Sequence, residues 1–374
     1  MTPEKQMEKS PHGGDIYRKE RITLDASVSV NPFPLPRAFK AAMRKCVDRV
    51  SRYPDLNQTE FRRAVARIEG LKPEYIIGGS GASELIMAVV RALAPKKILT
   101  AIPCFSGYRR AALVAGVEQI VEYPLKEESN FELDFGFLDA ITPDVDAVFL
   151  EDPNNPTGKS ILPDLEAAII DRCDDLSVPL ILDESFLQLG KKNASAAILS
   201  SRSPNLYVVN SFTKTYAIPG LRVGYLVSNP ENVERVKQNL PEWNMSLFAQ
   251  EVGALCANEL NRASYVRKAR NAIYEEAPRF ENELRKLGLK VVSTDTNFIL
   301  FYTPEEGLCE HMLSRGILIR DCANFRGLRQ GWFRVAVRTP KENQRIIREL
   351  QIWKKQRDEM REITQAREST DTTE

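Results

Sequence analysis

Short apolar runs recur through the middle of the chain, and helical spacing of apolar residues separates several of them. The runs have the length of strands and many end next to Gly, Asp, Asn or Ser. They cover residues 75–77, 98–100, 147–150, 180–182, 206–209 and 223–226. Helical spacing appears at 85–93 and 165–173. This alternation predicts an α/β fold whose large domain has a mostly parallel sheet flanked by helices.

The pattern changes after about residue 241. A long helical region is followed by short segments at 297–302, 311–315, 317–320 and 332–337, which predict a smaller α+β C-terminal domain. We expect residues 1–45 to form an N-terminal arm that joins this small domain, 46–245 the large domain, and 246–374 the small domain. The first 20 residues are expected to be flexible. The charged stretch from Lys354, which lacks an apolar face, predicts a fraying helix and a disordered tail.

Composition narrows the choice of partners. The 374 residues include 52 Lys and Arg against 51 Asp and Glu, and this balance argues against nucleic acid or a membrane surface as the main partner. No segment has the length of a membrane span, and the polar first ten residues do not resemble a signal peptide. Six scattered cysteines without a CxxC pair indicate reduced thiols and a cytoplasmic protein. With two histidines, no metal site is expected.

Polar residues follow the predicted strands, where ligands of such sheets collect. A glycine-rich turn at 78–83 precedes a helix, and its free backbone N–H groups suit a phosphate. The glycine spacing does not match a dinucleotide fingerprint. The next strand leads into residues 152–158, which include PNNPTG. Thr157 to Ser160 hints at a nucleotide loop, but that motif needs glycine where Pro153 stands.

Charged side chains follow the next two strands. Asp183 comes after residues 180–182, and a carboxylate there either caps a helix or holds a cation such as a protonated pyridine. Ser211, Thr213 and Lys214 follow residues 206–209, and Arg222 comes shortly afterwards. Most single lysines are surface residues, so Lys214 alone decides nothing. The ordered set carries the argument.

From about residue 12 to 348 this ordered set resembles the fold-type-I pyridoxal-phosphate enzymes, the aminotransferase superfamily. The resemblance implies the aspartate-aminotransferase fold, with pyridoxal 5'-phosphate as cofactor. Lys214 would carry the cofactor and act in catalysis. Asp183 would hold the proton on the pyridine nitrogen, because a neutral ring is a poorer electron sink. Asn155 would donate to the phenolic oxygen.

The same resemblance implies the remaining cofactor contacts. The phosphate would be bound by residues of the glycine-rich turn and of the lysine segment, namely Gly81, Ala82, Ser83, Ser211, Thr213 and Arg222. Phe105 would stack on the ring. Tyr53 would reach the phosphate bound by the neighbouring subunit, which implies a homodimer with shared active sites.

Within the superfamily the sequence looks like the threonine-phosphate decarboxylases of cobalamin biosynthesis. The matching stretches are residues 12–14, 183–186, 211–222, 317–325 and 333–338. Phe186 stands where many aminotransferases carry a tyrosine. This resemblance implies decarboxylation of O-phospho-L-threonine to 1-aminopropan-2-ol O-phosphate.

Such a substrate has two anionic ends and calls for two basic sites. The resemblance assigns the α-carboxylate to Arg334, with Asn155 nearby, and the substrate phosphate to Arg320 and His12. The chain departs from the family pattern near the expected substrate mouth. These departures are Asp15, Ser29 and Pro34.

Two alternatives remain open. One is an aminotransferase of the histidinol-phosphate aminotransferase type, which shares the cofactor site and also takes a phosphorylated amine. The run from Arg320 to Phe325 and the residue Phe186 favour the decarboxylase. The other is a non-catalytic binding or regulatory protein on this fold, which would not need to keep Lys214, Asp183 and Asn155 together.

Overall fold

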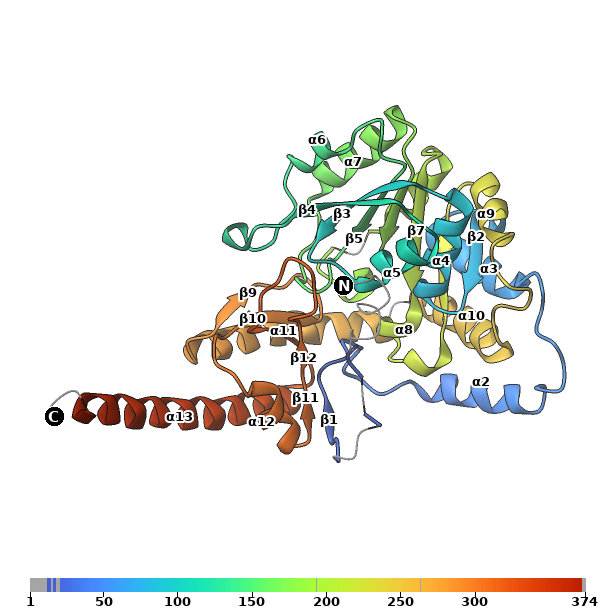
Figure 1. Ribbon diagram of the computed structural model, residues 1–374. Coiled ribbons are helices and arrows are strands. Elements are labelled where there is room, and N and C mark those ends of the chain that lie inside the picture. Colours follow the sequence, from blue (N-terminus) through green and yellow to red (C-terminus); the bar gives the residue numbers. More distant parts are fainter. Residues whose placement is uncertain (1–11, 15, 18–20, 193, 263, 372–374) are drawn as a thin grey trace.

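The computed structural model describes residues 12–14, 16–17, 21–192, 194–262 and 264–371. A seven-stranded sheet forms the centre of the larger body, in the order β2-β8-β7-β6-β5-β3-β4 (Figure 1). All neighbouring strands are parallel except around β8, which is antiparallel to both β2 and β7. The strands are β2 Ile76–Gly79, β3 Lys97–Ile102, β4 Gln119–Pro124, β5 Ala147–Glu151, β6 Leu180–Asp183, β7 Leu206–Ser211 and β8 Gly224–Val227. The predicted mostly parallel sheet is confirmed.

Helices cover both faces of this sheet. In β5, Val148 and Leu150 enter one hydrophobic core, whereas Ala147 and Phe149 enter the other. A strand buried on both sides reads as a continuous apolar run, which is why these strands were visible in the sequence. One face packs against α3 (Thr59–Glu69), α6 (Phe137–Ala140), α7 (Pro163–Asp175) and α10 (Leu247–Arg262). The other packs against α4 (Ala82–Leu93), α5 (Ser106–Val114) and α9 (Pro230–Lys237).

The smaller body has its own hydrophobic core and a four-stranded antiparallel sheet in the order β12-β13-β10-β9. Its strands are β9 Lys290–Val292, β10 Phe298–Tyr302, β12 Arg320–Asp321 and β13 Trp332–Ala336, and its helices are α11 Ser264–Lys286, α12 Leu308–Ser314 and α13 Pro340–Asp371. The N-terminal strand β1 (Leu24–Asp25) pairs in parallel with β11 (Ile317–Leu318). The arm therefore completes the smaller body from the other end of the chain.

Helix α10 begins just after residue 245, the expected limit between the large and the small domain. It packs against α3 and against α2 (Arg37–Val47). Its buried residues, among them Val252 and Cys256, belong to the core of the larger body. The expected domain limits stay a prediction.

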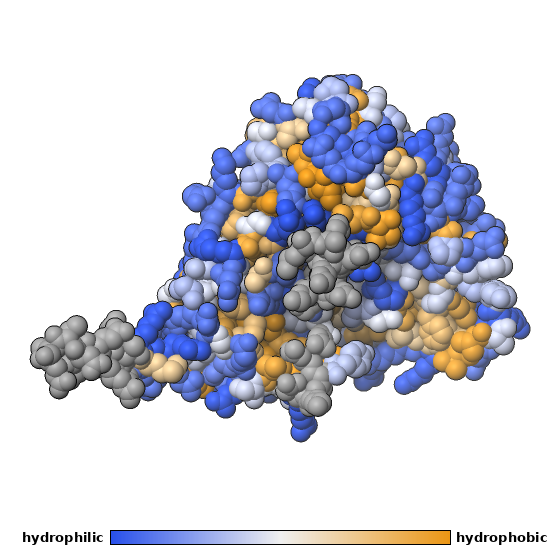
Figure 2. All heavy atoms as spheres, viewed as in Figure 1, coloured by the Kyte–Doolittle hydropathy of each residue, from blue (hydrophilic) through white to orange (hydrophobic). Residues whose placement is uncertain are grey.

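The C-terminal helix is longer than the sequence suggested. Fraying was expected from Lys354, whereas the backbone of α13 continues to Asp371 and projects away from the molecule (Figure 1). Most side chains visible on its described part are hydrophilic (Figure 2), with Met360 an exposed apolar exception. Pairs one turn apart, Lys354 with Asp358 and Lys355 with Glu359, support this solvated helix. The first 11 residues, expected to be flexible, lie outside the described part. No described helix is both long and apolar enough to cross a membrane.

Candidate active site

A cavity of about 340 Å³ lies where the two bodies meet, and residues of both line it. Strands β5, β6 and β7 are neighbours and end there with Glu151, Asp183 and Ser211. The cavity therefore lies beyond the carboxyl ends of parallel strands, where such sheets bind ligands. The predicted site residues that line it are His12, Ala82, Ser83, Phe105, Asn155, Asp183, Ser211, Thr213, Lys214, Arg222, Arg320 and Arg334. Gly81 and Tyr53 are not among its lining residues.

Lys214 lies in α8 (Phe212–Thr215), a single turn of helix directly after β7. Its amine reaches the cavity and lies 5.6 Å from the centre of the Phe186 ring. Burial, with the nearby cations Arg334 and Arg222, lowers its pKa to about 8. A lysine whose pKa is lowered in this way holds much more neutral amine near neutral pH than a surface lysine. Lys214 is therefore prepared to act as a nucleophile.

Asp183 ends β6 and is buried, with 8% of its surface exposed. One carboxylate oxygen accepts the Tyr108 hydroxyl at 2.8 Å, and the other accepts the Ser185 backbone N–H at 2.9 Å. Burial raises the pKa of this carboxyl above its ordinary value. A cation in the cavity would favour its charged form. The position suits a partner for a protonated ring nitrogen.

Another part of the cavity lining suits an anion. Ala82 and Ser83 open the 12-residue helix α4, whose first N–H groups have no partners within the helix. Gly81, the residue before α4, has φ +83°, and a Cβ there would lie 2.5 Å from the Arg222 guanidinium. The positive φ favours glycine there, whereas the Arg222 guanidinium is the far end of a flexible side chain and could move aside. Gly81 thus shapes the turn before α4 without lining the cavity. Ser211 and Thr213 add hydroxyls from the segment before Lys214.

Phe105 and Asn155 come from two loops that follow neighbouring strands, β3 and β5. The amide oxygen of Asn155 accepts a hydrogen bond from Arg334. The amide nitrogen of Asn155 is therefore the group suited to donate to a ring oxygen. Phe186 also lines the cavity and packs edge-on against Phe298, with ring centres 5.0 Å apart. It supplies no hydroxyl at the position where many aminotransferases have one.

Arg320 and Arg334 are direct partners across the antiparallel pair β12–β13. Both are buried, with 6% and 7% of their surfaces exposed, and both line the cavity. Arg334 donates to the Ser27 carbonyl at 3.1 Å, and its Nε has no hydrogen-bond partner among the described residues. Burial and the nearby Arg320 lower the pKa of Arg334 to about 10. Like charges placed opposite one another are unfavourable, so this pair indicates a site for an anionic ligand.

His12 approaches the cavity from the N-terminal arm, and its ring centre lies 6.2 Å from that of Phe105. Burial and the cations Arg320 and Arg110 lower its pKa. The backbone next to it is held in place, because the Gly14 N–H donates to the Ser27 hydroxyl at 2.8 Å. The structure thus brings His12 and Arg320 to the same end of the cavity.

The residues expected at the substrate mouth are placed differently. Ser29 is buried, its hydroxyl has no partner among the described residues, and it does not line the cavity. Pro34 is exposed and is not among the lining residues either. Asp15 lies outside the described residues. Ser27 and Val28, which directly precede Ser29, line the cavity instead; they follow β1, which pairs with β11.

Tyr53 stands away from this cavity. It is 81% exposed, and its ring centre lies 4.7 Å from that of Trp243. Such exposure of two large aromatic rings is unusual for a monomer surface. Its expected role at the phosphate of a second subunit stays a prediction.

Sequence reasoning missed Tyr108 and Glu151. Tyr108 lies on α5, one helical turn after Phe105, and reaches Asp183. Glu151 ends β5 and is 6% exposed. A carboxylate in an otherwise apolar strand was the available signal for Glu151, since charged residues are seldom fully buried without partners. The helical position of Tyr108 gave no comparable signal.

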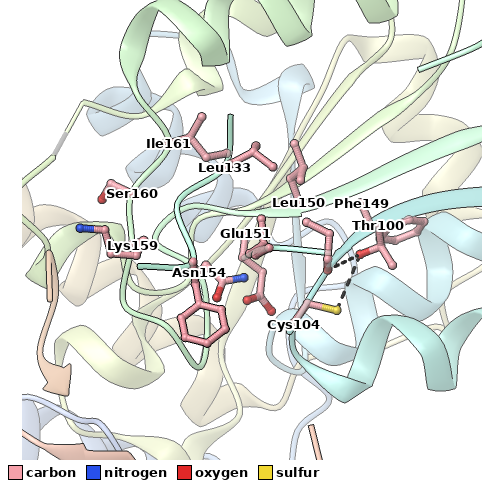
Figure 3. Close-up of a pocket in the computed structure, with 13 residues that line it drawn as sticks. Thr100, Cys104, Leu133, Phe149, Leu150, Glu151, Asn154, Lys159, Ser160 and Ile161 are labelled. Carbon is pink, nitrogen blue, oxygen red and sulfur yellow. Dashed lines mark hydrogen bonds between the residues drawn. The ribbon is translucent and has the colours of Figure 1, made fainter. Parts of the chain in front are cut away.

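A second, small cavity of about 20 Å³ adjoins the main one, with room for about one water molecule. Figure 3 shows the Glu151 carboxylate between Asn154 and Cys104, next to this space. Glu151 lines both cavities and so forms part of the wall between them. Among the described residues, no group of three or more His, Cys, Asp or Glu could hold a metal ion.

The donor set fits pyridoxal phosphate. The lining includes a buried carboxylate, and it includes a helix N-terminus with two hydroxyls and an arginine. It also includes a lysine with a lowered pKa, an amide and an aromatic ring. These groups match the ring nitrogen, the phosphate, the aldehyde, the ring oxygen and the ring face of the cofactor, respectively.

Comparison with known proteins agrees with this chemistry. The family model for aminotransferases of class I and II matches residues 23–350. The chain is 34% identical to threonine-phosphate decarboxylase of Salmonella typhimurium, covering 90% of this chain and 95% of that protein. It is 31% identical to histidinol-phosphate aminotransferase of Chlorobium phaeovibrioides, covering 88% and 90%. The structure of histidinol-phosphate aminotransferase from Clostridium acetobutylicum superposes with a TM-score of 0.82 at 28% identity, covering 89% of this chain and 99% of that one.

The chain therefore belongs to the class I and II aminotransferase family. It is an enzyme of the fold-type-I architecture, and its cofactor is pyridoxal 5'-phosphate. Within the family its sequence is similar to the threonine-phosphate decarboxylases.

Proposed function

We propose that this enzyme decarboxylates O-phospho-L-threonine to 1-aminopropan-2-ol O-phosphate, as the names of its relatives suggest. The observation that carries the proposal is the pairing of Arg320 with Arg334 across β12–β13 inside the cavity. A substrate with a carboxylate and a phosphate ester offers two anionic groups to this pair. An amino acid without a phosphate would leave one buried arginine unpaired, which is costly.

The roles of the two arginines follow from their neighbours. Arg334 bonds to Asn155, and Asn155 belongs to the cofactor end of the cavity. Arg334 is therefore assigned to the α-carboxylate, which must lie near the reacting carbon. Arg320 lies on the same side as His12 and is assigned, together with it, to the phosphate ester. A phosphate dianion there would raise the pKa of His12 again. The protonated imidazole would then donate to the phosphate alongside Arg320.

The cofactor, when bound, supplies an electron sink for the bond that breaks. The protein's part is to choose that bond and to manage the protons. Arg320 binds the distal phosphate and thereby orients the substrate. This binding does not strengthen the interaction with the carboxylate that departs. Lys214, with its lowered pKa, is placed to return a proton to the α-carbon. Asp183 keeps the charge that the ring nitrogen needs.

We further propose a homodimer in which Tyr53 reaches the cofactor phosphate of the second subunit. Several large apolar side chains are exposed close to Tyr53 in the sequence, and Trp243 lies against its ring. They are Val47, Val50 and Leu56. An exposed group of this kind favours burial against a second copy of the chain. We also propose a cytoplasmic location, since all six cysteines are free thiols.

An aminotransferase acting on a phosphorylated amine is the second candidate, because a relative named histidinol-phosphate aminotransferase is 31% identical to this chain. Phe186 favours the decarboxylase, since it replaces the tyrosine that many aminotransferases carry.

One assay separates the two. The purified enzyme with pyridoxal phosphate is offered phosphothreonine, phosphoserine or histidinol phosphate, each with and without a 2-oxo acid as amino acceptor. We expect carbon dioxide from phosphothreonine without any acceptor, and little keto acid. Amino transfer from histidinol phosphate without release of carbon dioxide from phosphothreonine would refute the decarboxylase proposal.

A further inference from the structure

Glu151 lines both cavities and has no role in the proposed chemistry. Its carboxylate joins two loops by accepting two backbone hydrogen bonds. One oxygen accepts the Phe105 N–H at 2.8 Å, and the other accepts the Asn155 N–H at 2.6 Å. Figure 3 shows the carboxylate pointing into the space between these loops, beside Cys104 and Asn154. The Glu151 side chain therefore helps to set the separation of the two loops.

The two loops carry residues with complementary tasks. Under the proposed function, Phe105 contacts the face of the cofactor ring and Asn155 contacts its oxygen. The same two loops are also joined by Asn154, whose side-chain amide donates to the Pro103 carbonyl at 3.0 Å. Loop positions are less restrained than strand positions, so such contacts matter for their spacing. A buried carboxylate that accepts from both backbones fixes their spacing more firmly, since charged hydrogen bonds are shorter and stronger than neutral ones.

Glu151 also lies close to the proposed partner of the ring nitrogen. It stands directly opposite Asp183 in the β5–β6 register. The groups that face it are Asp183 from β6, Tyr108 from α5, Cys104 from the loop after β3, and Arg334 from β13. Burial and the Asp183 charge raise the pKa of Glu151 to about 8, while its two N–H donors favour the charged form. Near neutral pH the Glu151 carboxyl is therefore largely protonated in the empty cavity, and a cation bound there would favour its charged form.

We propose that Glu151 is a positioning residue of the cofactor site, which helps to space Phe105 and Asn155 through its two backbone hydrogen bonds and, when a protonated cofactor ring is bound, adds a second negative charge beside Asp183. The proposal rests on the cofactor roles given above, but not on the identity of the substrate. Under this proposal Glu151, which forms part of the wall between the two cavities, contributes to the cofactor site.

The test compares three variants in binding and spectroscopy. Glu151→Gln removes the charge and replaces one of the two acceptor oxygens by a donor. Glu151→Asp keeps the charge, but its shorter side chain cannot reach both N–H groups. Glu184→Gln is the matched control, because Glu184 is 1% exposed, accepts from Ser195 and Ala196, and does not line the cavity.

Three quantities are measured for each protein. They are the dissociation constant of pyridoxal phosphate from the apoprotein, the pH midpoint of the absorbance change of the bound cofactor, and the melting temperature of the apoprotein. We expect Glu151→Gln to weaken cofactor binding about tenfold, the usual effect of losing one charged hydrogen bond. Its midpoint should fall by about one pH unit, since a negative charge that stabilises the protonated form is gone. Glu151→Asp should weaken binding with little change of midpoint.

Glu184→Gln should lower the melting temperature at least as much as Glu151→Gln, while leaving binding and midpoint unchanged. The proposal is overturned if Glu151→Gln binds the cofactor normally with an unchanged midpoint, or if the two glutamine variants change binding equally. An enzyme that binds pyridoxal phosphate as expected here but releases no carbon dioxide from phosphothreonine would contradict the proposed reaction instead. The two failures are therefore distinguishable.

Discussion

Replacing Arg320 by alanine should separate phosphorylated from non-phosphorylated substrates. Arg320 is 6% exposed, and one of its terminal nitrogens donates to Asn324 at 2.7 Å. A hydrogen bond from a charged group to phosphate contributes about 1.5–3 kcal/mol, so kcat/KM for phosphothreonine should fall about ten- to a hundredfold. The pKa of Arg334 is lowered by burial and by the nearby Arg320. Because the change removes this second cause, the binding of the carboxylate by Arg334 should not weaken. Turnover of threonine should therefore change little.

The assay is the steady-state release of carbon dioxide from phosphothreonine and from threonine by each variant. Arg315→Ala serves as the control, because Arg315 lies five residues earlier, pairs with Glu349 at the surface, and does not line the cavity. Arg334→Ala should impair both substrates. Equal losses on the two substrates for Arg320→Ala would show that Arg320 has a structural role, and the proposed phosphate site would lose its main support.

Further expectations concern the cofactor and the dimer. Lys214→Ala should abolish the borohydride-reducible link between protein and cofactor while circular dichroism shows an intact fold, and a remaining lysine adduct in the mass spectrum would contradict the assignment. Because the pKa of Lys214 is lowered to about 8, the rate of cofactor attachment to the apoprotein should be level above that pH and fall about tenfold per pH unit below it, as the amine becomes protonated. Asp183→Asn should reduce turnover by about a hundredfold or more, since a positioned charge contributes a few kcal/mol to catalysis, and near-normal activity would exclude its role. Sedimentation should show a dimer. Tyr53→Phe should weaken cofactor binding without dissociating the dimer, and a fully active monomer would contradict the shared site.

The large sheet was readable from the sequence because its inner strands are buried on both faces. Their apolar runs are nearly continuous, and the helices between them show the ordinary 3.6-residue spacing. The edge strand β4 was missed, because its residues are mostly half-buried and include Glu122 and a terminal Pro124. The core into which α10 packs could not be read from its sequence. Helical periodicity shows that a helix buries one face, but not which of two cores receives it.

Site residues could be predicted from the sequence where they follow the strands in a specific order. Asn155, Asp183 and Lys214 were expected at the cavity and line it. Glu151 was overlooked because a single carboxylate at a strand end has many ordinary explanations. Ser27 and Val28 were overlooked because their place over the cavity depends on the β1–β11 pairing. A contact between segments so far apart leaves no local pattern in the sequence.

The pairing of β1 with β11 also has a consequence for how the protein is made. Thr23 donates to the carbonyl of Gly316, 293 residues further along the chain. At roughly 5–20 residues per second, a ribosome needs on the order of 15–60 seconds to supply that partner. All strands of the large sheet are synthesised before then, since the last of them, β8, ends at Val227, so the sheet can form before β1 finds its partner strand. Ribosome-bound chains stopped after α10 should thus already protect the strands of the large sheet from proteolysis while the segment around Leu24 is still cut.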